Sequence, residues 1–232
     1  MSKTIVITGA GKGIGFETAL QLSGSGCTVV ALSRNAASLE KLSVKSGGAI
    51  HILPFDLTSG KSGELTAFLQ SKNIYAVDAL INNAGVLVKK SFEEITIDDL
   101  RSSYEVNVFA PYLLIQHLLP LLKKSTLAHV VNISSMGGFQ GVQKFPGLSA
   151  YSSSKAALVG LTECLAEELK DTNVKVNCLC LGAVQTEMLA DAFPGYTAPV
   201  NAADMAVFVA DFTLKNHLLM NGKIIPVALS TP

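Results

Sequence analysis

Short apolar runs alternate with amphipathic stretches along the chain. The runs are rich in β-branched residues and are bounded by glycine or polar residues, as is typical of buried strands. Strands are expected at residues 5–8, 27–32, 49–55, 77–81, 127–133, 174–180 and 223–227. Between them, the spacing of apolar positions predicts helices at residues 16–22, 36–46, 63–71, 96–124, 150–170 and 202–214.

This alternation of strands and helices predicts an α/β fold. We expect a Rossmann-like, doubly wound parallel sheet of about seven strands, flanked by helices on both faces and joined by right-handed crossovers. The sequence contains no internal repeat, low-complexity tract or linker, so residues 1–232 are expected to form a single domain. Ligands of such sheets bind at the carboxyl ends of the strands.

The composition restricts the classes of molecule that the protein is expected to bind. Apolar residues make up 49% of the chain and charged residues only 16%, which favours a large core and an apolar subunit interface. The net charge is zero, so nothing indicates nucleic acid or an anionic membrane as a partner. The longest uncharged run, Val106 to Leu122, is shorter than a membrane span and is interpreted as a buried helix.

The four cysteines, Cys27, Cys164, Cys178 and Cys180, do not form a disulfide framework. Cys178 and Cys180 would share one face of a strand, but no second pair of ligands lies nearby in the sequence, so no metal site is expected. Reduced thiols, together with an N-terminus that lacks the apolar core of a signal peptide, predict a cytoplasmic protein.

A glycine-rich turn runs from Gly9 to Gly15, between the first strand and the first helix. Strand, glycine turn and helix form the context of a dinucleotide-binding fingerprint. Gly9, Gly13 and Gly15 would let a pyrophosphate approach the backbone, and the helix would offer its first N–H groups. The glycines are spaced more widely at the front than in GxGxxG, and a glycine turn can also be an ordinary loop.

The end of the second strand carries a cation where NAD-binding folds place an acid on the ribose 2′-hydroxyl. Arg34 follows Ser33 there, and Lys12 lies in the glycine turn. Two cations at the adenosine ribose suit a 2′-phosphate, so NADP(H) is favoured as the cofactor over NAD(H). The alternative interpretation is a pair of solvated surface cations.

Tyr151 and Lys155 are four positions apart on a predicted helix and therefore share one face. A nearby ammonium favours the phenolate form of a tyrosine, so this pair could transfer protons. An isolated pair of this kind is more often an ordinary surface feature. Here, however, other polar residues also follow the predicted strands, namely Thr8, Arg34, Asp56, Asn82, Ser135 and Thr186.

Six motifs in order resemble the short-chain dehydrogenase/reductases of single-domain type. They are Thr8-Gly9-x-x-x-Gly13-x-Gly15, Asn82-Asn83-Ala84-Gly85, Asn107, Asn132-Ile133-Ser134-Ser135, Tyr151-x-x-x-Lys155 and Gly182-x-x-x-Thr186. The resemblance covers essentially the whole chain, and the wide glycine spacing is the family's own.

The resemblance implies four catalytic residues. Tyr151 would give a proton to a carbonyl oxygen as hydride arrives at the carbon, and Lys155 would hold the nicotinamide ribose and lower the pKa of Tyr151. Ser135 would hydrogen-bond the substrate oxygen, and Asn107 would hold a water that links Lys155 to solvent. Ser134 and Ser135 would point to opposite faces of their strand, and the family motif favours Ser135.

The resemblance also implies a cofactor site along the ends of the strands. The expected cofactor contacts are Gly9, Lys12, Gly13, Ile14, Gly15, Ser33, Arg34, Asp56, Leu57, Asn83, Ala84, Gly85, Tyr151, Lys155, Gly182, Val184 and Thr186. Asn82 and Asp78 look more like residues that anchor the sheet.

Three departures from the family concern the loops beside this site. Leu181 stands where proline is common, and proline would have fixed the backbone there. The segment 137–147 lengthens the connection from Ser135 to Tyr151, and it could line the substrate pocket or be only a surface loop. The segment from Thr186 to Asp204 is short, which predicts an open site and a bulky or loosely selected substrate.

The function predicted from the sequence is an NADP(H)-dependent oxidoreductase acting on a small-molecule carbonyl or secondary alcohol. The alternative is an NADP(H)-binding regulatory or scaffold protein with little turnover. The apolar sides of residues 106–122 and 158–169 correspond to helices that often pair in this family, which implies a homodimer or homotetramer.

Overall fold

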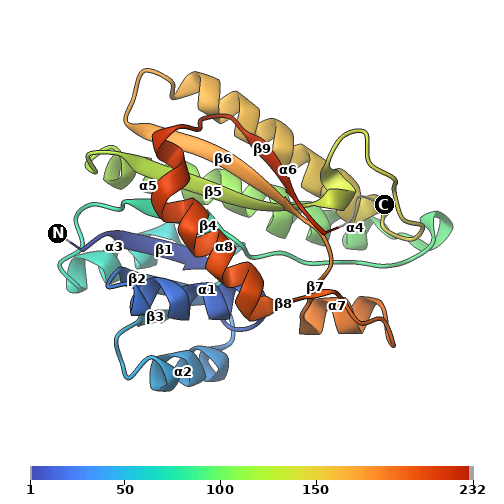
Figure 1. The fold of residues 1–232 in the computed structure, drawn as a ribbon, viewed down its shortest axis with the longest axis horizontal. Helices are drawn as coiled ribbons and strands as arrows, with labels where there is room; N and C mark the ends of the chain where they lie inside the picture. Colours follow the sequence, from blue (N-terminus) through green and yellow to red (C-terminus); the bar gives the residue numbers. More distant parts are fainter. Residues whose placement is uncertain (1, 230–232) are drawn as a thin grey trace.

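The computed structural model describes residues 2–229, which form around one parallel sheet of seven strands in the order β3-β2-β1-β4-β5-β6-β9 (Figure 1). The strands are β1 (Thr4–Thr8), β2 (Thr28–Ser33), β3 (His51–Pro54), β4 (Ala79–Asn82), β5 (Ala128–Ser135), β6 (Val174–Leu181) and β9 (Ile224–Val227). The predicted fold class and strand number are therefore confirmed.

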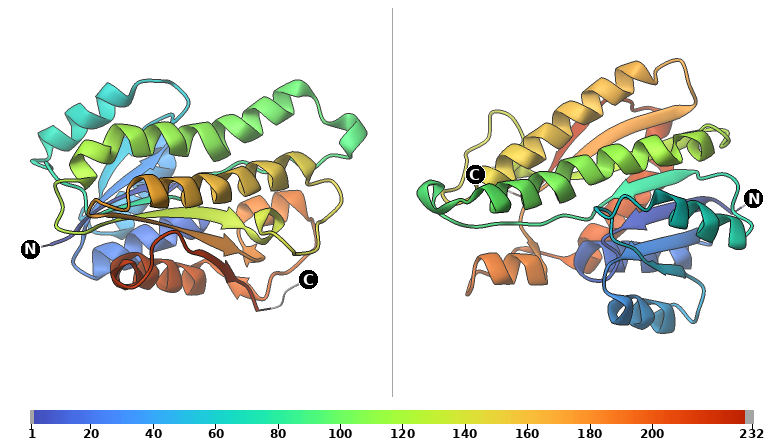
Figure 2. Two further views of the ribbon diagram at one scale, coloured as in Figure 1. Left: turned by 90° about the horizontal axis from the view of Figure 1, so that it is seen from above. Right: turned by 180° about the vertical axis from the view of Figure 1, so that it is seen from behind.

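Two layers of helices cover the sheet (Figure 2, left). One layer holds α1 (Gly13–Gly24), α2 (Ala36–Lys45) and α8 (Ala202–Lys215), and the other holds α3 (Ser62–Ser71), α5 (Ala110–Leu122) and α6 (Ser149–Glu168). Residues along each strand alternate between the layers. In β1, Ile5 and Ile7 pack towards α1 and α8, whereas Val6 packs towards α3 and α5.

The strand order reverses at β1, which pairs with β2 on one side and with β4 on the other. At such a reversal the connections leave in opposite directions, and a crevice opens beyond the carboxyl ends of the strands. The glycine turn after β1 and the loop after β4 border this crevice.

The predicted helix at residues 96–124 is confirmed as one continuous helical stretch. It consists of α4 (Ile97–Tyr104), a π-helical turn (η2, Glu105–Phe109) and α5. With 26 residues, Ile97–Leu122 is long and apolar enough, by length and composition, to cross a membrane, although residues 106–122 alone fall short of a span. Side chains on one side of α5, including Leu114 and Leu118, pack into the core under the sheet.

The interpretation of residues 106–122 as a buried helix is wrong for its outer face. Phe109, Tyr112 and Leu113 are exposed by about half of their surface, at 49%, 49% and 54%. Only the side that faces the sheet is buried, because a helix in an outer layer has the sheet on one side only.

Several short elements were not predicted. Two-residue strands β7 (Val184–Gln185) and β8 (Val200–Asn201) pair in parallel, and α7 (Glu187–Ala192) lies between them in the chain. The 3-10 turns η1 (Phe92–Glu94), η3 (Met136–Gly138) and η4 (Asn216–Leu218) are equally short. Elements of two to six residues complete too little of a period for an apolar pattern to indicate them.

Candidate active site

The glycine turn is shaped by close backbone packing. A Cβ on Gly15 would lie 2.3 Å from Asn83 Nδ2, and one on Gly9, whose φ is +66°, would lie 2.8 Å from Ala84 Cα. Asn83 Nδ2 donates to the carbonyls of Thr8 (3.0 Å) and Gly9 (3.3 Å), and Thr8 Oγ1 accepts from the N–H groups of Asn83 and Ala84. Thus the motif residues after β1 and β4 hold each other in place.

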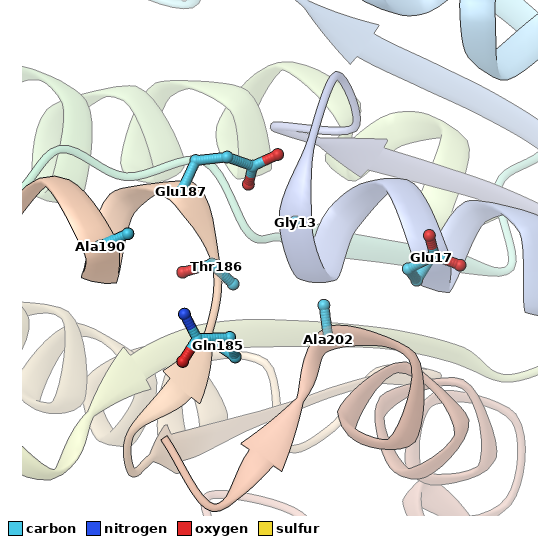
Figure 3. A pocket seen from close by; sticks show the side chains of 7 residues that line it. All are labelled: Gly13, Glu17, Gln185, Thr186, Glu187, Ala190 and Ala202. Atoms are coloured by element: carbon cyan, nitrogen blue, oxygen red, sulfur yellow. The ribbon is translucent and has the colours of Figure 1, made fainter. Parts of the chain in front are cut away.

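The start of α1 fits an anionic group such as a diphosphate. Lys12 is the N-cap, and no side chain within residues 2–229 caps the first N–H groups of the helix. Thr186 lies against Gly13, where a Cβ would be 3.3 Å from Thr186 Cγ2, and both residues border a cavity of about 380 Å³ (Figure 3). The cavity is lined by Gly13, Glu17, Gln185, Thr186, Glu187, Ala190 and Ala202. Two of these residues, Glu17 and Glu187, carry carboxylates that would repel an anion inside the cavity. The N–H groups and the positive end of the helix dipole therefore favour a phosphate at the start of α1 itself.

The adenosine side of the predicted site lies at the ends of β2 and β3. Ser33 approaches the glycine turn closely, because a Cβ on Gly11 would lie 2.6 Å from Ser33 Oγ. The pKa of Asp56 is lowered, first by hydrogen bonds from Thr58 and to a smaller extent by the charge of Arg34. Lys12 and Arg34 are exposed, and neither makes an ion pair within residues 2–229.

Four other predicted cofactor contacts lie along the same crevice. The side chains of Ile14, Leu57 and Val184 pack against the core. Gly182 donates its N–H to Val227 O at 2.9 Å, and a Cβ on Gly182 would lie 2.8 Å from Ala228 Cβ. This glycine is therefore required by packing against the chain after β9.

Lys155 is a buried cation without an acidic partner among the described residues. Only 4% of its surface is exposed, and Nζ donates to Ile133 O at 2.7 Å. Burial lowers its pKa to about 8, because removal from water disfavours the charged form. Nζ lies 5.9 Å from the centre of the Tyr151 ring. Both Lys155 Nζ and Asn107 Oδ1 border Gly85, where a Cβ would lie 3.4 Å and 3.3 Å from them.

The Asn107 side chain ties the π-helical turn to the loop after β4. Its Oδ1 accepts from Val86 N (2.9 Å), and its Nδ2 donates to Val86 O (3.0 Å) and Ser154 Oγ (2.9 Å). Such turns often mark functional sites. With the side chain engaged in this way, holding a water beside Lys155 would fall to the backbone of Asn107, and that role stays a prediction.

Ser134 and Ser135 lie on opposite faces of β5, as expected for neighbours in a strand. Ser134 is buried and donates to Lys155 O at 2.9 Å, so it positions the backbone of α6. Ser135 is partly exposed, and its Oγ accepts from Gly137 N at 3.1 Å. Ser135 is also close enough to Tyr151 to lower the pKa of the phenol, which places Ser135 beside it.

Burial has the largest effect on the pKa of Tyr151. Loss of water around the phenol disfavours its charged form and raises the pKa, and the neighbouring Ser135 hydroxyl only partly offsets this rise. Lys155 is not among the groups that shift this pKa, so the expected lowering by Lys155 stays a prediction.

Segment 137–147 divides into two parts. Phe139 and Val142 pack against the buried side chains of Met136, Cys178 and Cys180. The later part, with Lys144 and Phe145, lines a second cavity of about 500 Å³ together with Phe92 and the first turns of α6. The first part is therefore packed against the core and is not only a surface loop. That the later part lines the substrate pocket stays a prediction, because this cavity lies beside α6 and not at the glycine turn.

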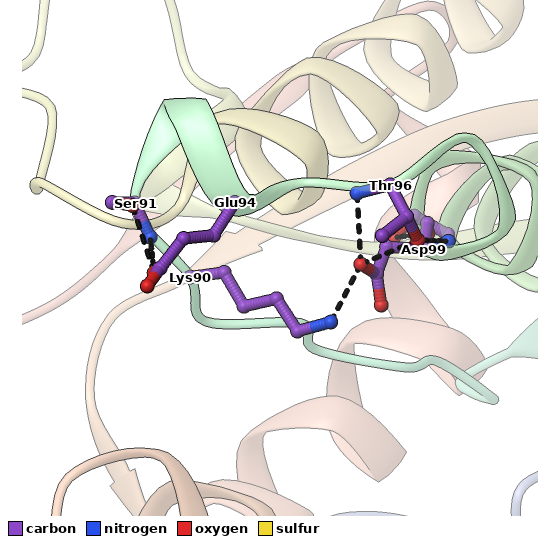
Figure 4. A network of polar contacts seen from close by, with 6 residues as sticks. Lys90, Ser91, Glu94, Thr96 and Asp99 are labelled. Atoms are coloured by element: carbon purple, nitrogen blue, oxygen red, sulfur yellow. Dashed lines mark hydrogen bonds and ion pairs between the residues drawn. The ribbon is translucent and has the colours of Figure 1, made fainter.

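A polar network that the sequence analysis overlooked holds η1 and the start of α4 (Figure 4). Ser91 and Glu94 form one capping box, and Thr96 and Asp99 form another. Lys90 Nζ donates to Asp99 Oδ2 at 2.7 Å and joins the two. The patterns S-x-x-E and T-x-x-D in the sequence could have indicated both caps.

Fold and site together define an α/β protein built to bind a dinucleotide. Residues 3–197 match the short chain dehydrogenase family, and the chain belongs to this family of oxidoreductases, as its motifs indicated.

Three known proteins illustrate the similarity. Ketoacyl reductase HetN from Nostoc sp. is 31% identical over 217 residues, which cover 88% of this chain and 74% of that protein. A short chain dehydrogenase from Shigella flexneri, complexed with NADP, is 29% identical, has a TM-score of 0.87, and is matched over 97% of this chain and 96% of its own. The 3-ketoacyl-(acyl-carrier-protein) reductase from Brucella melitensis, complexed with NADH, is 26% identical with a TM-score of 0.85 over 97% and 96%.

Proposed function

We propose that this protein is an NADP(H)-dependent oxidoreductase that transfers hydride between the nicotinamide and a small-molecule carbonyl or secondary alcohol. The observation that carries the proposal is the placement of Tyr151, Ser135 and Lys155. They converge at the end of β5, beside a glycine turn whose N–H groups suit a diphosphate.

NADP(H), when bound, supplies the hydride, and the chain supplies orientation and a proton. The raised pKa of Tyr151 keeps its hydroxyl protonated at neutral pH, as a proton donor to a carbonyl oxygen requires. Ser135 Oγ accepts from Gly137 N, so its own hydrogen can point to the same oxygen. Two hydroxyls aimed at one oxygen stabilise the negative charge that develops there.

Lys155 would hold the ribose of the cofactor. One of its three hydrogens is donated to Ile133 O, which leaves two for the ribose hydroxyls. A pKa of about 8 keeps most of the ammonium charged at neutral pH, and that charge favours phenolate during alcohol oxidation. Ser134 and Ser154 fix this part of α6 through Lys155 O and Asn107 Nδ2.

The preference for NADP(H) rests on the end of β2. Arg34 and Lys12 border it, both exposed and unpaired within residues 2–229, and the β2 end carries no acid for a ribose 2′-hydroxyl. Among the neighbours in structure, the Shigella protein carries NADP and the Brucella protein NADH. NAD(H) is therefore the alternative cofactor, and the preference is tested by comparing the affinities for NADPH and NADH.

Turnover of a panel of ketones and aldehydes with NADPH tests the function, with Tyr151→Phe as the decisive variant. Loss of the acid/base group is expected to lower kcat/KM by about 10³-fold, while NADPH binding followed by fluorescence stays within about twofold. Tyr75→Phe, at an exposed residue between α3 and β4, should match the parent. NADPH binding without turnover of any compound would favour the regulatory or scaffold alternative.

We also propose that the protein is a homodimer or homotetramer. The half-exposed Phe109, Tyr112 and Leu113 form an apolar face on α5 that a second copy would cover. Light scattering that shows only a species of 24.4 kDa would contradict this.

The cytoplasm remains the proposed location. The four cysteines are free thiols, and Cys178 and Cys180 are fully buried. Recovery of the protein in a secreted or membrane fraction of its own cells would contradict the proposal.

A further inference from the structure

The loops that follow β4, β5 and β6 meet at Lys89. Lys89 Nζ donates to Ala192 O, at the last residue of α7, over 2.9 Å, and lies 4.0 Å from the centre of the Phe193 ring. A Cβ on Gly147, in the loop after β5, would lie 3.4 Å from Lys89 Cγ. The neighbouring Lys90 donates its N–H to Gly147 O at 3.1 Å.

This meeting point lies across the mouth of the proposed site. In the sheet, β5 lies between β4 and β6, and it ends at Ser135. A side chain that reaches from the loop after β4 to the helix after β6 therefore spans the end of β5. The loop itself starts at the site, because Gly85 borders Lys155.

The lid, residues 186–199, is held independently at its base. Thr186 caps α7 through Leu189 N, and Gln185 Oε1 accepts from Ala198 N at 2.8 Å. The far end of α7 is instead held from outside the lid, by Lys89. Within residues 2–229, Lys89 makes the only hydrogen bond between the loop after β4 and the lid.

The contact has the character of a reversible latch. A lysine near the C-terminal carbonyls of a helix is favoured by the dipole, and an ammonium over an aromatic face gains a further, modest attraction. Lys89 makes no ion pair in the described part of the chain, whereas Lys90 pairs with Asp99 at 2.7 Å. Lys89 thus holds the lid through contacts weak enough to break in each turnover.

We propose that Lys89 is a positioning residue that latches α7 over the mouth of the site and holds the lid closed while substrate is bound. The inference rests on the proposed function, because closing matters only if the site turns over. Lid closure of this kind excludes water and often controls substrate capture and product release.

The test compares Lys89→Met with the matched control Lys90→Met. Methionine keeps an unbranched apolar side chain at the exposed position and removes the ammonium. The first readout is hydrogen–deuterium exchange of residues 187–193 in the cofactor-free protein. Exchange should be about three- to tenfold faster in Lys89→Met and unchanged in Lys90→Met. Lys89→Arg, which keeps a donor and a cation, should restore slow exchange.

The second readout is steady-state kinetics with NADPH and a carbonyl substrate. Lys89→Met should raise KM by about three- to tenfold and leave kcat unchanged or higher, because an open lid releases product faster. Unchanged exchange in Lys89→Met, or faster exchange with an unchanged KM, would overturn the proposal. If the parent turns over no substrate but the exchange difference is found, the latch stands as a contact and the proposed function fails.

Discussion

The two ends of the sheet differ in how far their polar side chains find hydrogen-bond partners within the protein. At the amino end, Asp78 accepts from Thr4 N (2.7 Å) and Ser125 Oγ (2.6 Å) through its two carboxylate oxygens. His129 uses both ring nitrogens, one with Thr213 O and one with Asn177 Nδ2, each at 3.0 Å. Each of these polar side chains finds its partners within the protein.

At the carboxyl end, hydrogen-bonding capacity remains. Lys155 makes one hydrogen bond within the described chain, Ser135 accepts one, and no side chain caps the start of α1. Buried polar groups are normally satisfied, so groups with spare capacity at the end of a parallel sheet indicate a ligand. A polar side chain at the end of this sheet therefore stabilises the fold when the protein fills its hydrogen bonds, as with Asp78 and His129, and can serve a site when some remain unfilled, as with Lys155.

Removal of Asp78 should separate stability from binding most clearly. Asp78→Ala leaves Thr4 N and Ser125 Oγ without their acceptor, so the free energy of unfolding is expected to fall by about 3 kcal/mol. Urea unfolding measures this, with Asp98→Ala as the control, because Asp98 lies in an exposed pair with Arg101 and should change stability by less than about 0.5 kcal/mol. The affinity of the folded variant for NADPH should stay the same. A loss of affinity would contradict the assignment of Asp78 to stability alone.

Lowering the pH should reduce the free energy of unfolding through His129, at the amino end of the sheet. Burial lowers the pKa of His129 to about 3, so the unfolded chain, whose histidine titrates near ~6.5, binds the proton first. The contribution of neutral His129 is therefore complete above pH ~6.5 and is lost as the pH falls towards 3. Unfolding at pH 5 should show a loss of about 2 kcal/mol from this group.

The parent and His129→Gln, unfolded at pH 7.5 and pH 5, isolate that contribution. The variant should be less stable at pH 7.5 but should lose about 2 kcal/mol less between the two pH values. An equal loss in both proteins would show that other groups control the acid response.

The smallest of the three effects concerns cofactor choice at the carboxyl end. Arg34→Ala should raise the Kd for NADPH about tenfold, or about 1.4 kcal/mol, and leave the Kd for NADH unchanged. Fluorescence titration measures both. Arg101→Ala is the control, because Arg101 is exposed in an ion pair on α4. Equal weakening for both cofactors would remove the preference for NADP(H).

Sequence reasoning was most successful for features that depend on residues close together in the chain. Runs such as Ile5-Val6-Ile7 predicted strands, and the order of motifs identified the family. It also recognised Asp78 and Asn82 as anchors of the sheet, and the structure confirms bonds to Thr4 N and Asn132 Oδ1. It did not find Lys89, because its partners on α7 lie about a hundred positions further along the chain.

By itself, then, the sequence determined the α/β class, the order of its elements and the face shared by Tyr151 and Lys155. Periodicity and i,i+4 spacing are properties of neighbouring residues. Only the tertiary structure decided that Ser135 lies beside Tyr151, that burial raises the pKa of that phenol, and that Lys89 reaches the lid. Burial and long-range contacts depend on how the elements pack, which no local pattern encodes.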